Sequence, residues 1–176
     1  KTPISKNPLF NGACEFKIDN YLEYLSGLEY KSKNIINKIN EIQIVRGGKS
    51  LLFFDVGSPP KKKYSQGYQS GPLSFEYFVD NNKIITNCGF GNKISKKTKL
   101  ISRLTSAQST ICLNDSSVVK FERNNLIKNA FGATITNSFK VYDCSVDEKN
   151  DSTILSAKHN AYENNFGYIC QRIIKV

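Results

Sequence analysis

The sequence lacks several features that mark common functional classes. None of its 176 residues is methionine, and only one, His159, is histidine. Because a single imidazole cannot build a multi-histidine site, such a metal centre within this chain is excluded. No apolar run approaches the roughly 18 residues that a membrane-spanning helix requires, so we expect no membrane partner. The lack of an initiator methionine indicates a piece of a longer polypeptide or a processed product.

Cysteine pairs with metal-ligand spacing are also missing. The five cysteines are scattered along the chain without a Cys-x-x-Cys pair, so neither a zinc knuckle nor a redox pair is predicted. Their odd number leaves at least one thiol unpaired in a monomer. The cysteines therefore do not identify the cell compartment.

Arginine is scarce in a sequence that is otherwise basic. The formal net charge is +10 and the isoelectric point is about 9.4, yet nearly all of the cations are lysines. Such a charge favours an anionic partner, which is an acidic polysaccharide, a nucleic acid or an acidic membrane surface. An AT-rich coding sequence produces the same excess of lysine without any selection for binding. Nucleic acid ranks last, because the basic loops lack arginine and a recognition helix.

Short strand-like segments dominate what is present. They are rich in β-branched and aromatic residues and are bounded by Gly, Asn, Asp, Ser or Pro. They predict an all-β fold, an antiparallel β-sandwich in a single domain over residues 1–176. The segments are residues 42–46, 50–56, 73–79, 83–88, 109–113, 117–122, 132–143, 152–159 and 167–176.

One helical segment is expected near the N-terminus. Residues 18–41 carry apolar side chains at near-helical spacing, and Asp19 is a suitable cap for the start of a helix. We expect the helix to be broken near Gly27. The sequence thus predicts a β-sandwich with one short N-terminal helical segment.

Two long loops stand out between the expected strands. Residues 57–72 contain the triplet Lys61–Lys63 together with Tyr64 and Tyr68, and residues 89–103 are strongly basic. Aromatic rings stack on sugars or bases while lysines neutralise acidic groups. Long loops are often functional, although solvated connections are equally common. From the residues alone, the sequence indicates a basic β-sandwich that binds an anionic ligand.

Five motifs extend this interpretation. "PLFNGACE", "FFDVGSPP", "GPLSFEYFVDNNKIITNCG", "RLTSAQSTICLNDSS" and "AKHNAYENNFGYICQRIIKV" follow one another in the order and spacing of a known domain. Together they resemble the C-terminal domain of the heparinase II/III family of polysaccharide lyases, in its bacterial branch. The resemblance implies a β-sandwich preceded by an α/α toroid that this chain does not contain. It also implies that acidic, uronate-containing polysaccharide lies in the cleft between the two domains. The compartment is left open between periplasm and cytoplasm.

The resemblance also identifies positions where this chain departs from the family. The family's His-x-His pair falls on Gly67 and Gln69, and a later histidine falls on Gln108. Those histidines serve catalysis and, in some members, a structural metal. Glutamine has no titratable group near neutral pH and is a poor metal ligand, so no metal, no cofactor and no catalytic residue is predicted here. The resemblance assigns His159 and Tyr162 a structural role.

Two functions remain open at this point. In the first, the chain is one wall of a lyase cleft, the full-length protein cleaves its substrate by β-elimination, and this chain alone is inactive. In the second, it is a non-catalytic module for acidic glycans that has lost the family's histidines. For the first function, the expected substrate-binding residues are Lys61, Lys62, Lys63, Tyr64, Tyr68, Gln69 and Gln108. For the second function, binding is expected to depend on the lysine triplet at positions 61–63.

Overall fold

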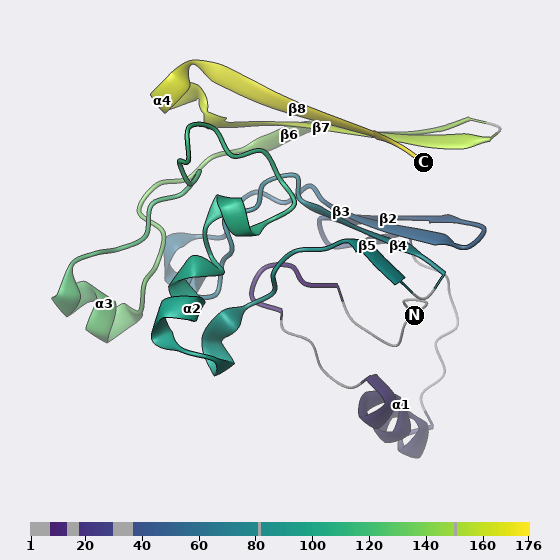
Figure 1. Cartoon of the computed structure of the whole chain (residues 1–176), viewed down its shortest axis with the longest axis horizontal. Coiled ribbons are helices and arrows are strands. Elements are labelled where there is room, and N and C mark those ends of the chain that lie inside the picture. The colour runs from purple at the N-terminus through teal and green to yellow at the C-terminus, as the bar shows by residue number, and fades with distance from the viewer. Residues whose placement is uncertain (1–7, 14–17, 30–36, 81, 150) are drawn as a thin grey trace.

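Two antiparallel sheets form the protein (Figure 1). The computed structural model describes residues 8–13, 18–29, 37–80, 82–149 and 151–176. The strands follow one another in order within each sheet, β1-β2-β3-β4-β5 in one and β6-β7-β8 in the other. The predicted antiparallel sandwich is confirmed. The bounds are β1 Lys38–Ile39, β2 Ile42–Gly47, β3 Ser50–Asp55, β4 Phe75–Val79, β5 Asn82–Ile85, β6 Val141–Lys149, β7 Ser152–Tyr162 and β8 Tyr168–Lys175.

Tight turns join the strands of the first sheet. The β2–β3 turn places Gly48 at a φ of 43°, where a side chain would be strained, and Gly47 pairs with Ser50 at its base. Asp80 has a φ of 51° in the β4–β5 turn, a conformation that Asp tolerates better than most residues. The expected hairpin over residues 73–88 is therefore present, with β5 paired antiparallel to β4.

The prediction of two strands is wrong. Residues 109–113 and 117–122 form only isolated bridges, Leu113 to Ser116 and Phe121 to Ile135, and the strand expected from residue 132 begins at Val141. Side-chain oxygens take the amides that a ladder would need: Val118 N–H donates to Thr105 Oγ1 and Val119 N–H to Ser70 Oγ. Loop hydroxyls thus replace strand pairing here.

The helices agree with the sequence only in part. Helix α1 (Ile18–Gly27) ends at the expected break. The expected cap at Asp19 falls on a side chain outside the described part of the structure. The near-helical spacing of the sequence continues to residue 41, but Lys38–Ile39 form β1, which pairs with β2. Residues 30–36 lie outside the described part. Three further helices were not predicted: α2 (Lys96–Ile101), α3 (Asn125–Phe131) and α4 (Glu163–Phe166). Within the described ranges, no helix is long and apolar enough to cross a membrane.

Capping residues explain two of these short helices. Ser95 Oγ accepts a hydrogen bond of 3.0 Å from Thr98 N–H at the start of α2. Asn124 Oδ1 accepts from Leu126 N–H at 3.0 Å at the start of α3. Serine and asparagine before a short polar run are known N-cap signals, so both starts were detectable in the sequence. Both helices lie at the end of the sandwich away from the β2–β3 turn (Figure 1).

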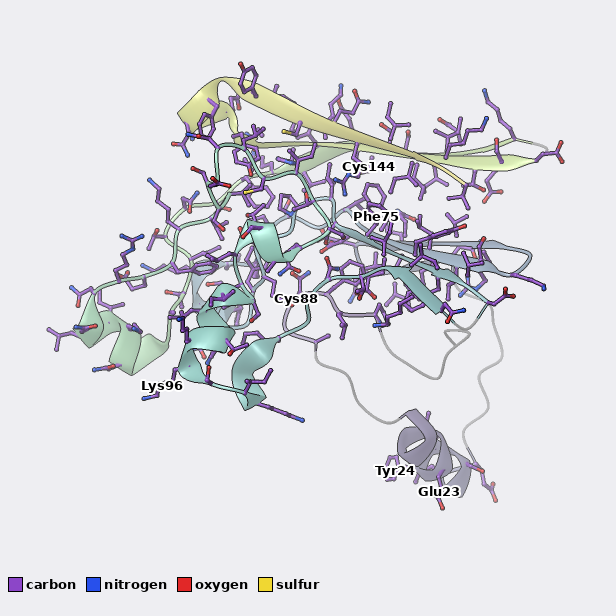
Figure 2. All side chains as sticks on the ribbon, in the orientation of Figure 1. Glu23, Tyr24, Phe75, Cys88, Lys96 and Cys144 are labelled. Atoms are coloured by element: carbon purple, nitrogen blue, oxygen red, sulfur yellow. The ribbon has the colours of Figure 1, made fainter. Side chains whose placement is uncertain are left out.

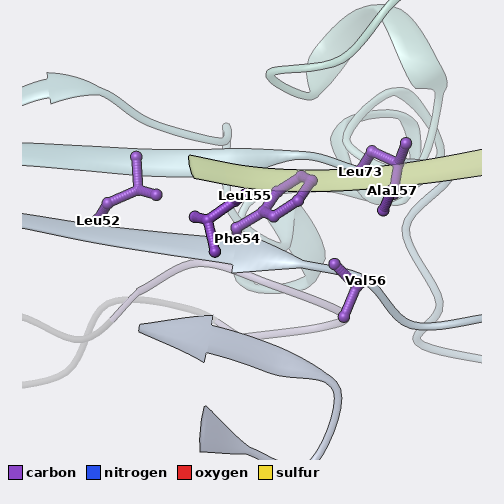
Figure 3. Close-up of a cluster of buried hydrophobic side chains, with 6 residues drawn as sticks. All are labelled: Leu52, Phe54, Val56, Leu73, Leu155 and Ala157. Carbon is purple, nitrogen blue, oxygen red and sulfur yellow. The ribbon is translucent and has the colours of Figure 1, made fainter. Parts of the chain in front are cut away.

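The main core lies between the two sheets (Figure 3). Its buried side chains come from the β3 side and from β7 across the gap, and burying a Leu or Phe contributes about 1.5–3 kcal/mol. Arg172 on β8 also spans the sheets, because one Nη donates to Leu73 O at 2.8 Å and the guanidinium lies 5.1 Å from the Phe75 ring, labelled in Figure 2. The cluster comprises Leu52, Phe54, Val56, Leu73, Leu155 and Ala157.

Candidate functional site

The segment that carries the replaced histidine positions, residues 65–70, is largely buried and tightly bound. Arg103 holds it, since Nε donates to Tyr68 O at 2.9 Å and Nη2 donates to Ser65 O at 2.8 Å. Nη1 donates to Ala133 O at 2.6 Å, and the guanidinium lies 4.0 Å from the centre of the Phe121 ring. Burial lowers the pKa of Arg103 to about 10, which leaves it charged at neutral pH. Residues 65–70 are therefore a fixed part of the fold.

Gln69 and Gln108 meet at one carbonyl oxygen. Gln69 Nε2 donates to Ser102 O at 3.0 Å and to Gly89 O at 2.9 Å, while its Oε1 accepts from Gly12 N–H at 2.9 Å. Gln108 Nε2 donates to the same Ser102 O at 2.8 Å. We call this pair the amide node. The structure thus brings together two of the replaced positions, which lie far apart in the sequence.

The third replaced position, Gly67, lies close to the same place. A Cβ added at Gly12 would lie 3.1 Å from Gly67 O, so the backbone of Gly67 packs against the residue that donates to Gln69. Gly12 itself has a φ of 94°, which favours glycine. This close backbone packing places Gly12, from the N-terminal "PLFNGACE" motif, beside the amide node.

The amide node does not fit the structural metal that the resemblance associates with some family members. Both glutamines direct N–H groups at backbone carbonyls, so neither nitrogen offers a lone pair to a cation. Among the residues that the structure describes, no group of three His, Cys, Asp or Glu side chains is placed to hold a metal. No chemical step through a metal is derived from these residues.

A pocket of about 450 Å³ opens beside the amide node. Cys88, Gly89 and Ser102 are among its lining residues, and the lining as a whole is mostly apolar. Figure 2 labels Cys88 near the middle of the view, between Lys96 of α2 and Phe75 of β4. Burial raises the pKa of the Cys88 thiol, so the group is protonated rather than nucleophilic at neutral pH. The remaining lining residues are Leu9, Phe90, Gly91, Lys93, Ile94, Thr98, Ile101 and Ala107.

The predicted substrate-binding residues divide into an exposed group, a buried group and one partly buried residue, Gln108. Lys61, Lys62, Lys63 and Tyr64 are exposed, with a 3₁₀ turn over Lys62–Tyr64, and Lys63 Nζ lies 4.7 Å from the Tyr64 ring centre. Lys62 Nζ lies 3.7 Å from Glu122 Oε2. Tyr68 and Gln69, by contrast, are only 6% and 2% exposed. Direct contact with a large ligand is expected from the exposed group.

His159 and Tyr162 lie in the core on β7. His159 is 1% exposed, and burial, assisted by the charge of Arg172, lowers its pKa to about 4, so the ring is neutral at pH 7. The Tyr162 hydroxyl accepts from Leu113 N–H at 3.2 Å and lies 3.1 Å from Ile111 O. These contacts are with the core and with the backbone of the 111–116 turn.

A buried carboxyl near the site was not found from the sequence. Asp55, at the end of β3, accepts from Asn11 Nδ2 at 3.0 Å and from Gly57 N–H at 2.9 Å. Burial raises the pKa of Asp55 to about 6, and its charge contributes to raising the pKa of Tyr68 above its usual range. An Asp that follows an apolar run usually marks an exposed turn. Only the position of Asp55 on the inward face of the sheet could have indicated that this carboxyl is buried.

One family model and several solved structures match this chain. The family model described as "Heparinase II/III-like, C-terminal" matches residues 41–176, which confirms the resemblance drawn from the five motifs. Crystal structures of a heparan sulfate lyase from Pedobacter heparinus, wild type and mutant, superpose with a TM-score of 0.66 at 15% identity. A structure described as a heparinase III gene product gives a TM-score of 0.64 at 14% identity. A search of curated proteins finds no match.

The structural matches cover nearly all of this chain but only part of each matched chain. They cover 98% of this chain for the lyase from Pedobacter heparinus and 99% for the heparinase III product, but only 28% of each matched chain. This chain therefore spans a little over a quarter of the length of those proteins. At this level of identity the likeness establishes the fold.

Proposed function

Because the chain belongs to the heparinase II/III-like C-terminal family, we propose that it forms the β-sandwich wall of a cleft for acidic polysaccharide in a longer lyase. The family match over residues 41–176 carries this proposal. The structural likeness supports it, since the matched lyases contain much additional chain. That additional length agrees with the α/α toroid that the resemblance implies, and we propose the toroid as the partner of residues 1–176.

The proposed reaction is β-elimination at a uronate. The C5–H bond and the bond from C4 to the glycosidic oxygen break, a C4–C5 double bond forms, and the leaving oxygen takes up a proton. The lysines at positions 61–63 would neutralise uronate carboxylates, which makes the C5 proton easier to remove, and the Tyr64 ring would stack on a sugar. The amides of Gln69 and Gln108 hold no transferable proton near neutral pH. The base and the acid must therefore come from the preceding domain, and this chain alone is expected to be inactive.

The test is an assay of the full-length protein on a panel of uronate polymers. Product is followed by the ultraviolet absorbance of the unsaturated uronate. The matched control is the 176-residue chain alone, for which we expect no product. Lys61→Ala, Lys62→Ala and Lys63→Ala combined should raise KM for the polymer. If a correctly folded full-length protein releases no unsaturated product across the panel, the lyase proposal is refuted.

A second candidate function is a non-catalytic module that binds acidic glycans. The amide node favours it, because glutamines stand where the family has histidines and their amides are engaged within the protein. It predicts that the chain alone binds acidic glycan, that added salt weakens binding, and that the same triple lysine variant binds less well. Retention that ignores ionic strength would contradict it. Competition with DNA on the same column distinguishes glycan binding from nucleic-acid binding, which charge alone favours.

A further inference from the structure

An open groove of about 770 Å³ lies on the α2–α3 side of the molecule, outside the amide node. Three cations line it: Lys120, Arg123 and Lys128. The sequence analysis did not select any of them, because they are spread over a segment expected to be a strand and the loop after it. We call it the α2–α3 groove. Its other lining residues are Leu100, Leu104, Ser116, Ser117, Val119, Phe121, Glu122, Ala133, Thr136 and Asn165.

The charge of the α2–α3 groove is strongly one-sided. Its one lining carboxylate, Glu122, is already engaged: Oε1 accepts from the N–H groups of Arg123 and Asn124 at 3.0 Å, and Oε2 faces Lys62. These backbone hydrogen bonds, chiefly from Asn124, lower the pKa of Glu122. Within the described part of the chain, no carboxylate forms an ion pair with Lys120, Arg123 or Lys128. The groove therefore presents uncompensated positive charge.

The floor of the groove is apolar. Leu100 and Leu104 are 43% and 37% exposed, and the partly buried Phe121 is also a lining residue. Sugars carry apolar C–H faces together with polar or charged substituents. A lining that combines Phe and Leu side chains with cationic side chains matches this chemistry. The groove volume lies within the usual range for ligand sites, about 300–1,000 Å³.

The backbone that carries the lining residues is held in place by hydrogen bonds. Asn137 Oδ1 accepts from Lys120 N–H at 2.6 Å, and its Nδ2 donates to Val118 O at 3.0 Å. Arg103 packs against the Phe121 ring and donates to Ala133 O, so these two lining residues are held by the fold. A preformed site loses less conformational entropy on binding than a flexible one.

From these observations we propose that the α2–α3 groove is a subsite for one acidic sugar of an oligosaccharide. The anionic substituent lies against Lys120, Arg123 and Lys128, and the apolar face of the ring lies on Phe121 and Leu104. The inference rests on the proposed function and deepens it by adding a contact surface. The ion pair of Lys62 with Glu122 makes this surface continuous with the lysine triplet at positions 61–63.

The experiment measures binding of oligosaccharides to the 176-residue chain by isothermal titration calorimetry. The probes are a carboxylate-only uronate tetrasaccharide, a sulfated tetrasaccharide and a neutral one of equal length. The groove variant combines Lys120→Ala, Arg123→Ala and Lys128→Ala. A charge-matched control combines Lys140→Ala, Lys149→Ala and Lys175→Ala, which are exposed residues. Circular dichroism verifies that both variants fold.

We expect the groove variant to lose about tenfold or more in affinity and the charge-matched control to lose less than about threefold. Loss in the carboxylate arm identifies uronate as the ligand group, and loss in the sulfated arm alone identifies sulfate. Equal affinity of the groove variant and the control overturns the inference but leaves the lyase assay as an independent test of function. Binding of the neutral probe as tight as that of the acidic ones, or no binding of any probe, also overturns it.

Discussion

The pH dependence of stability is set in part by two buried groups of opposite sign, Asp55 and His159. The pKa of Asp55 is raised from 3.8 to about 6 in the folded protein. As the pH rises from about 4 to about 6, the unfolded chain releases this proton first, so the free energy of unfolding falls. The full loss is about 3 kcal/mol above pH 6, from a shift of roughly two pKa units.

His159 acts in the opposite direction. Its pKa is lowered from 6.5 to about 4 in the folded protein. As the pH falls from about 6.5 to about 4, the unfolded chain takes up this proton first, and the free energy of unfolding again falls, by about 3 kcal/mol in total. Between these limits the two contributions nearly cancel, so the pair should make little net change in the wild-type protein.

The substitution Asp55→Asn removes one of the two contributions. Asparagine keeps an oxygen for Gly57 N–H, so the local fold should persist. Between about pH 4.5 and about pH 7.5, the free energy of unfolding should rise by about 2 kcal/mol more in the variant than in the wild type. Urea unfolding at both pH values measures this, with exposed Asp115→Asn as the control. An equal change in wild type and Asp55→Asn would refute the account of Asp55 burial.

Further substitutions test the contacts around the site, all read from urea unfolding. Arg103→Lys should cost about 3 kcal/mol, because one ammonium group cannot reach three carbonyls and cover Phe121; a near-wild-type midpoint would contradict this. Tyr162→Phe should cost about 1–2 kcal/mol, since only the hydroxyl that holds the 111–116 turn is lost, and no change would exclude that role. Gln69→Ala should cost about 2–4 kcal/mol by leaving buried groups unpaired, whereas exposed Gln66→Ala should stay within about 0.5 kcal/mol; equal costs would rule out the amide node as a stabilising contact.

The sandwich was predictable because its strands are local. Each of the correct strands is a β-branched or aromatic run ended by a turn residue, which period-2 patterning detects. The wrong segments, 109–113 and 117–122, have the same composition. In 117–122, the amides of Val118 and Val119 donate to Thr105 and Ser70. In 109–113, those of Ser109 and Leu113 donate to Asn87 and Tyr162. These acceptors are side chains outside the segments, so no local pattern distinguishes the two segments.

The meeting of Gln69 and Gln108 was predictable from the sequence, but the burial of Gln69 was not. The order of motifs placed Gln69 and Gln108 together, and they do share a carbonyl. Their polarity suggested an exposed site, whereas tertiary hydrogen bonds bury Gln69. The α2–α3 groove was missed for a different reason. Its three cations lie within residues 120–128, in a segment expected to be a strand and the loop after it, whereas Leu100, Leu104 and Asn165 of its lining come from distant parts of the chain.

The order of the strands has a consequence for how the molecule reaches its native state. Every hydrogen-bonded strand pair joins neighbours in the sequence, so residues 38–85 and residues 141–175 each form a simple meander. Such local pairing closes short loops and is fast, whereas bringing the two meanders together closes a long one. We expect the association of preformed halves around Phe54 and Leu155 to limit the folding rate, and two separately expressed halves to be suitable for fragment complementation.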